Sequence, residues 1–272
     1  MNAHHAAPNR RRGLLVLAAI SSSAVLLAAA VLAFTRDDHD TAIPAATSTA
    51  APPTIATTPS GPMLPPTVDL FGNWLDIPAD PAGQPLPQDP AARPDPGRPD
   101  YLTAPPAGLA WQRGWDGAAI PVSRSDGPAQ IIAGIATGFA HTPQGAALAA
   151  LDAIARASAA PEGIWQTVVG QRFLGGGHTL LDRFARSHRT TPHAGRYLTV
   201  PDGVRVLPGY QPDFAVVQIA VRARDGWTYS TWPMAYTDGD WRIRVPDDPE
   251  TLWQPGTSIA TLTYFGTWRT TP

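Results

Sequence analysis

Residues 214–245, FAVVQIAVRARDGWTYSTWPMAYTDGDWRIRV, carry the clearest periodic pattern in the chain. Apolar and polar residues alternate along it, which predicts three strands, at 214–224, 227–236 and 240–245. The pairs Asp225-Gly226 and Asp238-Gly239 between them are typical of tight hairpin turns. The stretch therefore predicts a three-stranded antiparallel meander.

Three helices are predicted before the meander. In the first, Thr142 is the expected N-cap and Pro143 the first helical residue, and the pattern continues to about Ser158. Residues 161–173 and 178–188 predict the other two helices, with three glycines between them. Helices followed by strands indicate an α+β domain, and we expect the helices to pack on a curved antiparallel sheet.

Outward from this domain, the N-terminal part of the chain contains a candidate membrane anchor. Residues 13–34, GLLVLAAISSSAVLLAAAVLAF, have no charged side chain and would form a helix about 33 Å long, enough to cross a hydrocarbon core of about 30 Å. Arginines precede this stretch and aspartates follow it, so residues 1–12 are predicted to be a cytoplasmic tail. A cleaved signal peptide and a buried soluble helix are the alternatives.

Two proline-rich segments separate the anchor from the domain at 108–272. Residues 35–66 are rich in Ala, Thr and Pro and are predicted to be a disordered spacer. Residues 67–107 form a second proline-rich arm with apolar residues at both ends, so we expect it to be pinned to the domain at 71–78 and 100–106. Its prolines argue against helix and central strand, and further linker is the alternative.

Composition excludes several kinds of chemistry. The chain has no cysteine, which removes disulfides, thiolate nucleophiles and cysteine-ligated zinc. Its formal net charge of −2 provides no field that would attract nucleic acid. Every basic residue is arginine rather than lysine, a bias that we attribute to base composition and not to arginine chemistry.

No pattern in the sequence identifies a catalytic, metal or cofactor site. His178, His188 and His193 are the only close histidines, and the first two do not share a helix face. Ser125-Asp126 and the glycines at 175–177 are better explained as a turn and a helix connection than as a nucleophile and an anion loop. The chain is therefore predicted not to be an enzyme, and to hold no metal or cofactor.

One route to catalysis stays open. Asp152, Asp182 and Asp213 could face a pocket enclosed between the helices and the sheet, where paired carboxylates can act as acid and base. A cell-envelope enzyme or a ligand-binding domain that uses this pocket is the alternative function.

Aromatic residues are concentrated in the meander. Trp227 and Tyr229 are predicted on one face of the sheet, and Trp232 and Tyr236 on the other. Helices should cover one face and leave the other as a candidate interaction surface. Arg183 and Arg186, with Arg189, are predicted on the solvent face of the third helix and complete this candidate surface.

Residues 111–246 resemble a family of uncharacterised single-pass membrane proteins of high-GC Gram-positive bacteria, often linked to integrative or conjugative elements. The resemblance is carried by Gly138-Phe139, the helix start at 142–145 and the turn and strand at 238–242. The architecture is also similar to the nuclear transport factor 2-like, or cystatin-like, cone of bridging subunits in type IV secretion and conjugation machines. The resemblance implies a membrane-anchored, extracytoplasmic scaffold that binds other envelope proteins and a second copy of itself, without direct nucleic-acid binding.

Overall fold

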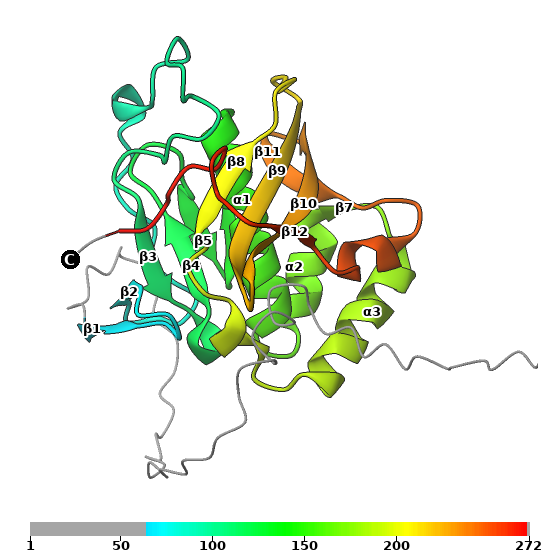
Figure 1. Ribbon diagram of the computed structural model, residues 1–272. Coiled ribbons are helices and arrows are strands. Elements are labelled where there is room, and N and C mark those ends of the chain that lie inside the picture. The colour runs from blue at the N-terminus through cyan, green and yellow to red at the C-terminus, as the bar shows by residue number, and fades with distance from the viewer. Residues whose placement is uncertain (1–63, 271–272) are drawn as a thin grey trace, which may run out of the picture.

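The computed structural model describes residues 64–270 and has the α+β architecture that the sequence predicts (Figure 1). The predicted tail, anchor and most of the spacer lie outside the described residues. Among residues 64–270, no helix is both long and apolar enough to cross a membrane.

The larger sheet contains the predicted meander. β9 (Phe214–Ala223) and β10 (Gly226–Thr237) form one antiparallel hairpin, and β10 pairs with β11 (Asp240–Arg244) in a second one. The three predicted strands and both turns are thus confirmed. Further strands extend this sheet on both sides: β7 (Phe173–Leu174), β8 (Gly203–Val206) and β12 (Thr257–Ile259).

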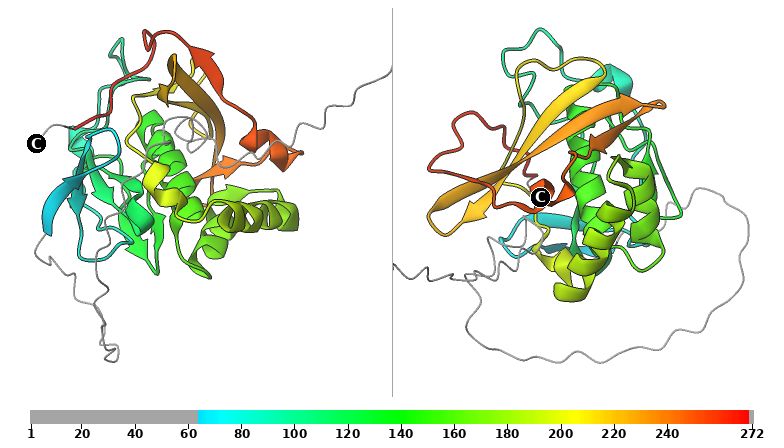
Figure 2. Two further views of the ribbon diagram at one scale, coloured as in Figure 1. Left: turned by 60° about the horizontal axis from the view of Figure 1, so that its bottom comes forward. Right: turned by 90° about the vertical axis from the view of Figure 1, so that its right-hand side faces the viewer.

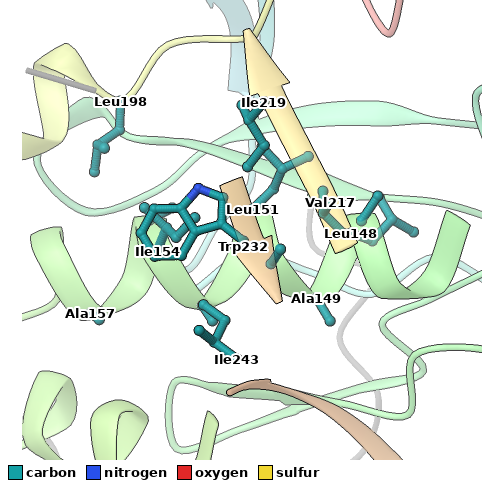
Figure 3. Close-up of a cluster of buried hydrophobic side chains, with 14 of the residues drawn as sticks. Leu148, Ala149, Leu151, Ile154, Ala157, Leu198, Val217, Ile219, Trp232 and Ile243 are labelled. Carbon is teal, nitrogen blue, oxygen red and sulfur yellow. The ribbon is translucent and has the colours of Figure 1, made fainter. Parts of the chain in front are cut away.

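Three α-helices follow the predicted pattern: α1 (Pro143–Ala159), α2 (Ile164–Arg172) and α3 (Gly177–Thr190). The Thr142 hydroxyl accepts a hydrogen bond from the Gly145 N–H at 3.0 Å, so the predicted N-cap is confirmed. α1 is buried along nearly its whole length because it contacts both the larger sheet and a second one. Leu148, Leu151 and Ile154 of α1 lie against Val217, Ile219 and Trp232 of the larger sheet (Figure 3).

The second sheet contains part of the predicted arm. Its order is β1 (Leu64–Val68), β2 (Trp74–Ile77), β3 (Ala110–Arg113) and β4 (Ala119–Val122). β2 is an inner strand, and its Leu75 is 1% exposed. The expectation that the arm would avoid central strands is therefore wrong at 74–77, because these four residues contain no proline and the surrounding prolines lie outside the ladder.

β1 begins at Leu64, so residues 64–66, predicted as the end of a disordered spacer, belong to a strand. Pro65 and Pro66 are tolerated there because β1 is the edge strand of its sheet. The interpretation of residues 67–107 as further linker is wrong, since they contain a strand and a buried leucine.

The C-terminal segment crosses the outer face of the larger sheet, where it is drawn in red (Figure 1). β12 pairs with β10, and Gly266 forms two backbone hydrogen bonds with Val204 of β8, each 2.9 Å long. The Trp111 indole N–H donates to the Trp268 carbonyl at 2.7 Å, which fastens the segment to the second sheet.

The long strands β9 and β10 cross the helical layer at an angle (Figure 2). The remaining elements are short: η1 (Pro90–Ala92), η2 (Trp115–Gly117), β5 (Gln130–Ile132), β6 (Ile135–Thr137), η3 (Ala194–Tyr197) and η4 (Pro249–Trp253).

Candidate functional site

The outer face of β10 carries two of the predicted surface aromatics. The register pairs Trp227 with Arg222 and Tyr229 with Ala220, whereas Trp232 pairs with Val217 of the core. Since side chains alternate along a strand, Trp227 and Tyr229 lie on the face opposite Trp232, as predicted.

Trp232 does not contribute to a surface. It is buried and belongs to the main hydrophobic cluster. Tyr236, on the same face, is half-buried: its ring stacks on His141 with the centroids 3.8 Å apart, and its hydroxyl donates to the Gly239 carbonyl at 2.9 Å. On the helical side of the meander, these aromatic side chains thus contact residues of the same domain. The candidate surface is restricted to the outer side.

The C-terminal segment covers part of that outer side. Trp227 pairs with Ile259 of β12, and the Phe265 ring lies 5.8 Å from the ring of Tyr229. Arg205 stacks on Phe265 with its guanidinium carbon 4.4 Å from the ring centre. Tyr229 is therefore partly covered by its own chain. Half-buried Trp227 remains beside the half-exposed Arg222, and its indole N–H is buried with no hydrogen-bond partner.

Arg183 lies in a buried position and not on a solvent face as predicted. Its guanidinium donates to Glu250 at 2.9 Å and to the Ser187 hydroxyl at 2.7 Å, and its carbon lies 4.4 Å from the ring centre of Trp253. The reason is that η4 packs on α3 and covers it. Burial lowers the pKa of Arg183, opposed by the Glu250 charge. Arg186 is exposed as predicted and pairs with the same Glu250 at 2.5 Å.

A small cavity lies between the helices and the larger sheet. The cavity lined by Ile154, Phe184 and Trp232 has a volume of about 10 Å³, which is room for about one water molecule. Asp152 is fully buried and pairs with Arg156, while Asp182 and Asp213 are exposed. The structure therefore does not bring the three candidate carboxylates together at a pocket.

The histidines considered as metal ligands are separated into different environments. His178 is exposed at the start of α3. The His188 ring stacks on Trp165 and its Nε2 lies 2.9 Å from the Ala157 carbonyl, while His193 Nδ1 pairs with Asp116 at 3.0 Å. Within residues 64–270, no three histidine or acidic side chains are grouped so that they could hold a metal ion.

Ser125 and Asp126 hold a loop together. Both are fully buried, and the Ser125 hydroxyl donates to the Asp126 carboxylate at 2.5 Å. The other oxygen of that carboxylate accepts from the Thr142 hydroxyl at 2.5 Å, which ties the turn to the start of α1.

The sequence motifs that carry the family resemblance meet at one point of the fold. The Asp240 carboxylate accepts hydrogen bonds from the Gly138 N–H at 3.0 Å, the Trp241 N–H at 2.8 Å and the Arg172 guanidinium at 2.8 Å. The Trp241 indole N–H donates to the Ala140 carbonyl at 2.9 Å. Sequence reasoning missed Arg172, because nothing local connects it to an aspartate 68 positions away. The hydrogen bonds of these motifs connect β6, α1, α2 and β11. The motifs therefore have a structural role.

A family model described as a domain of unknown function, DUF8175, matches residues 76–267, which is more than half of the chain. The match begins in β2 and extends beyond β12, so it includes the larger sheet and all three α-helices of the described part, whereas β1 of the second sheet lies outside it. No curated protein and no solved structure matches the chain.

Proposed function

We propose that this chain, which belongs to the DUF8175 family, is a membrane-anchored extracytoplasmic scaffold that binds other envelope proteins. We further propose that it is a subunit of a conjugative-transfer or type IV secretion-like apparatus. In this role the domain would bind protein partners and a second copy of itself, and no nucleic acid.

The location in this proposal is supported by the order of segments along the chain. The uncharged stretch at 13–34 follows arginines and precedes aspartates, a distribution typical of an anchor with its N-terminus in the cytoplasm. About 30 residues rich in alanine, threonine and proline then separate it from β1. Such a chain would hold the domain outside the membrane and let it reach partners at a distance.

The role as a scaffold is supported by the way the larger sheet is covered. Its inner side packs on α1 around a cavity of about 10 Å³, and this packed inner side suits a scaffold. Helices packed across a twisted antiparallel sheet suit a nuclear transport factor 2-like cone, the architecture that we propose for this part of the chain. An analogy of architecture does not by itself carry function.

The observation that carries the proposal is the unpartnered Trp227 on the outer face. Tryptophan is enriched at protein interfaces because its large apolar body carries one hydrogen-bond donor, and here that donor has no partner. Arg222 beside it is half-exposed and pairs with the buried Asp202 at 3.5 Å. A partner that packs against Trp227 could satisfy the indole N–H by a small movement of the ring.

Site-specific photo-crosslinking of the full chain in native membranes tests this proposal. A photoreactive amino acid at position 227 should yield adducts with other envelope proteins or with a second copy of the chain, identified by mass spectrometry. The matched control is position 132, because Ile132 is also apolar and is 65% exposed at the tip of the β5–β6 hairpin. Adducts at equal yield from both positions, or none from 227, would contradict the proposal.

The topology has its own test. Protease added outside intact cells should cleave the spacer and release the domain that includes residues 64–270. Complete protection in intact cells, combined with cleavage after lysis, would place the domain inside and overturn the proposed location.

A further inference from the structure

An open hollow of about 430 Å³ lies beside the C-terminal end of α1. It is formed where four elements end or turn: α1, α3, η2 and η3. Its size is within the range of small-molecule sites in proteins. The residues that matter for its chemistry are Trp115, Asp116, His188 and His193, with Pro161 and Pro192 completing the wall.

The indole of Trp115 is held in place by Arg156 and Gly134. The guanidinium carbon of Arg156 lies 5.6 Å from the ring centre, and Arg156 is itself fixed by Asp152 and by a hydrogen bond of 3.0 Å to the Gly134 carbonyl. Gly134 approaches the indole so closely that a Cβ there would lie 2.9 Å from the ring. Because these contacts fix its orientation, Trp115 can act as a rigid aromatic wall.

Two polar side chains meet at the rim in unusual backbone conformations. Asp116 (φ 54°) and His193 (φ 60°) are both left-handed, although neither is glycine. His193 Nδ1 lies 3.0 Å from one Asp116 oxygen, and the other oxygen accepts the Gly195 N–H at 3.3 Å. The His193 side chain is 74% exposed, so the second ring nitrogen is available to a ligand.

His188 adds a group of fixed orientation. Its ring stacks on Trp165 with the centroids 4.8 Å apart, and its Nε2 lies 2.9 Å from the Ala157 carbonyl. A carbonyl can only accept, so Nε2 is the donor in this contact, which leaves Nδ1 for a ligand. The Ser158 hydroxyl, buried without a hydrogen-bond partner, belongs to the same wall.

We propose that this hollow binds a neutral saccharide. A sugar ring presents an apolar C–H face that suits the indole of Trp115, and hydroxyl groups that can donate or accept, which suits the remaining ring nitrogens of His188 and His193. An anion fits poorly, because Asp116 is acidic and the described residues that line the hollow include no arginine. A cation fits poorly as well, because the Asp116 oxygens already bind His193 and the Gly195 N–H.

Saturation-transfer NMR on the full chain tests the site, with the protein in a detergent that has no sugar headgroup. The saccharide probes are chitotetraose and cellotetraose, with their monosaccharides as further arms, and inorganic phosphate is the anionic probe. We expect transfer to at least one saccharide. Stronger transfer to the tetrasaccharides would identify a polysaccharide chain as the source, and equal transfer per ring would identify a free sugar.

Three variants locate the site. Trp115→Ala removes the aromatic wall and should weaken binding about tenfold or more. His193→Asn and Asp116→Asn keep side chains that tolerate the left-handed backbone, so each should fold and still weaken binding. His178→Asn is the matched control on an exposed histidine outside the hollow, and it should bind as the unaltered chain does.

The binding measurements on these variants decide whether the hollow is a saccharide site. If Trp115→Ala fails to fold, the two asparagine variants decide. Absence of transfer to every saccharide at millimolar concentration would overturn the proposal, as would transfer that is unchanged in both asparagine variants. Phosphate that competes with the saccharide at the same concentration would also overturn it, since the site would then bind anions.

Discussion

Asp152 and Arg156 form an ion pair of 2.6 Å across one turn of α1, and both side chains are 0% exposed. Burial raises the pKa of Asp152, and the Arg156 charge opposes this. One oxygen of Asp152 and one Nη of Arg156 have no hydrogen-bond partner. A buried pair that is incompletely hydrogen-bonded adds little net stability, but removing one partner leaves a buried charge.

Asp152→Asn should therefore destabilise the protein strongly. The guanidinium of Arg156 cannot lose its proton, so it would remain charged in the core without a counter-ion. We expect a loss of about 3–5 kcal/mol in the free energy of unfolding, measured by urea denaturation. The double variant Asp152→Leu/Arg156→Met should recover most of this loss. A double variant as unstable as the single one would show that the pair stabilises the fold through more than its charges.

Arg156→Met should produce a stability that depends on pH. Without the arginine, burial would hold the pKa of Asp152 further above the value of 3.8 expected in the unfolded chain. Between the two pKa values the folded state binds the extra proton, so stability is highest below the unfolded pKa and falls as pH rises through the folded one. The slope can reach about 1.4 kcal/mol per pH unit.

Urea denaturation of Arg156→Met at pH 5, 6, 7 and 8 measures this dependence. The unaltered chain should change in the same direction but less, because Arg156 lowers the Asp152 pKa. Arg186→Met is the control, since that side chain is 51% exposed. A curve for Arg156→Met that runs parallel to the unaltered chain would contradict the prediction.

The parts of the fold that the sequence predicted depend on local signals. The alternation in 214–245 and the Asp-Gly turns specify β9, β10 and β11, and Thr142-Pro143 specifies the start of α1. Each of these signals acts over a few residues, so it can be interpreted without knowing what the segment packs against.

The parts that could not be predicted depend on distant partners. β2 is an inner strand because β3, more than 30 positions later, pairs with it. Arg183 is buried because Glu250 and Trp253 of η4 cover it. In the candidate surface, the face of Trp227 and Tyr229 followed from alternation. The ring contact between Phe265 and Tyr229 could not be predicted, since no local pattern shows that the C-terminal segment crosses this face.

Arg183 and Arg186 provide a comparison of two arginines that share one acid. Both bind Glu250, but Arg183 is buried against Trp253 and Arg186 is exposed. Arg183→Ala should lower the free energy of unfolding by about 2–3 kcal/mol, because it loses packing as well as charge. Arg186→Ala should change it by less than about 0.5 kcal/mol, as for other exposed ion pairs. Thermal or urea denaturation measures both, and equal losses would contradict the assigned burial.

Asp240 and Asp238 allow a buried and an exposed aspartate of one turn to be compared. The Asp240 carboxylate binds the buried Arg172 and the backbone N–H groups of Gly138 and Trp241. Asp238 is 70% exposed, and among residues 64–270 it pairs only with Arg242, at 3.0 Å. Asp240→Asn replaces one acceptor oxygen by an amide donor and leaves Arg172 without its counter-charge. The expected loss is about 3–5 kcal/mol.

Asp238→Asn is the matched control for this change. Asp238 has φ 52°, a left-handed conformation that asparagine adopts readily, so the turn should be kept and the loss should stay below about 1 kcal/mol. Hydrogen exchange adds a local readout: the Gly138 amide should exchange faster in Asp240→Asn under native conditions, and at an unchanged rate in Asp238→Asn. Equal protection of Gly138 in both variants would mean that the carboxylate of Asp240 does not hold β6 and β11 together, and that the clustered sequence motifs need another explanation.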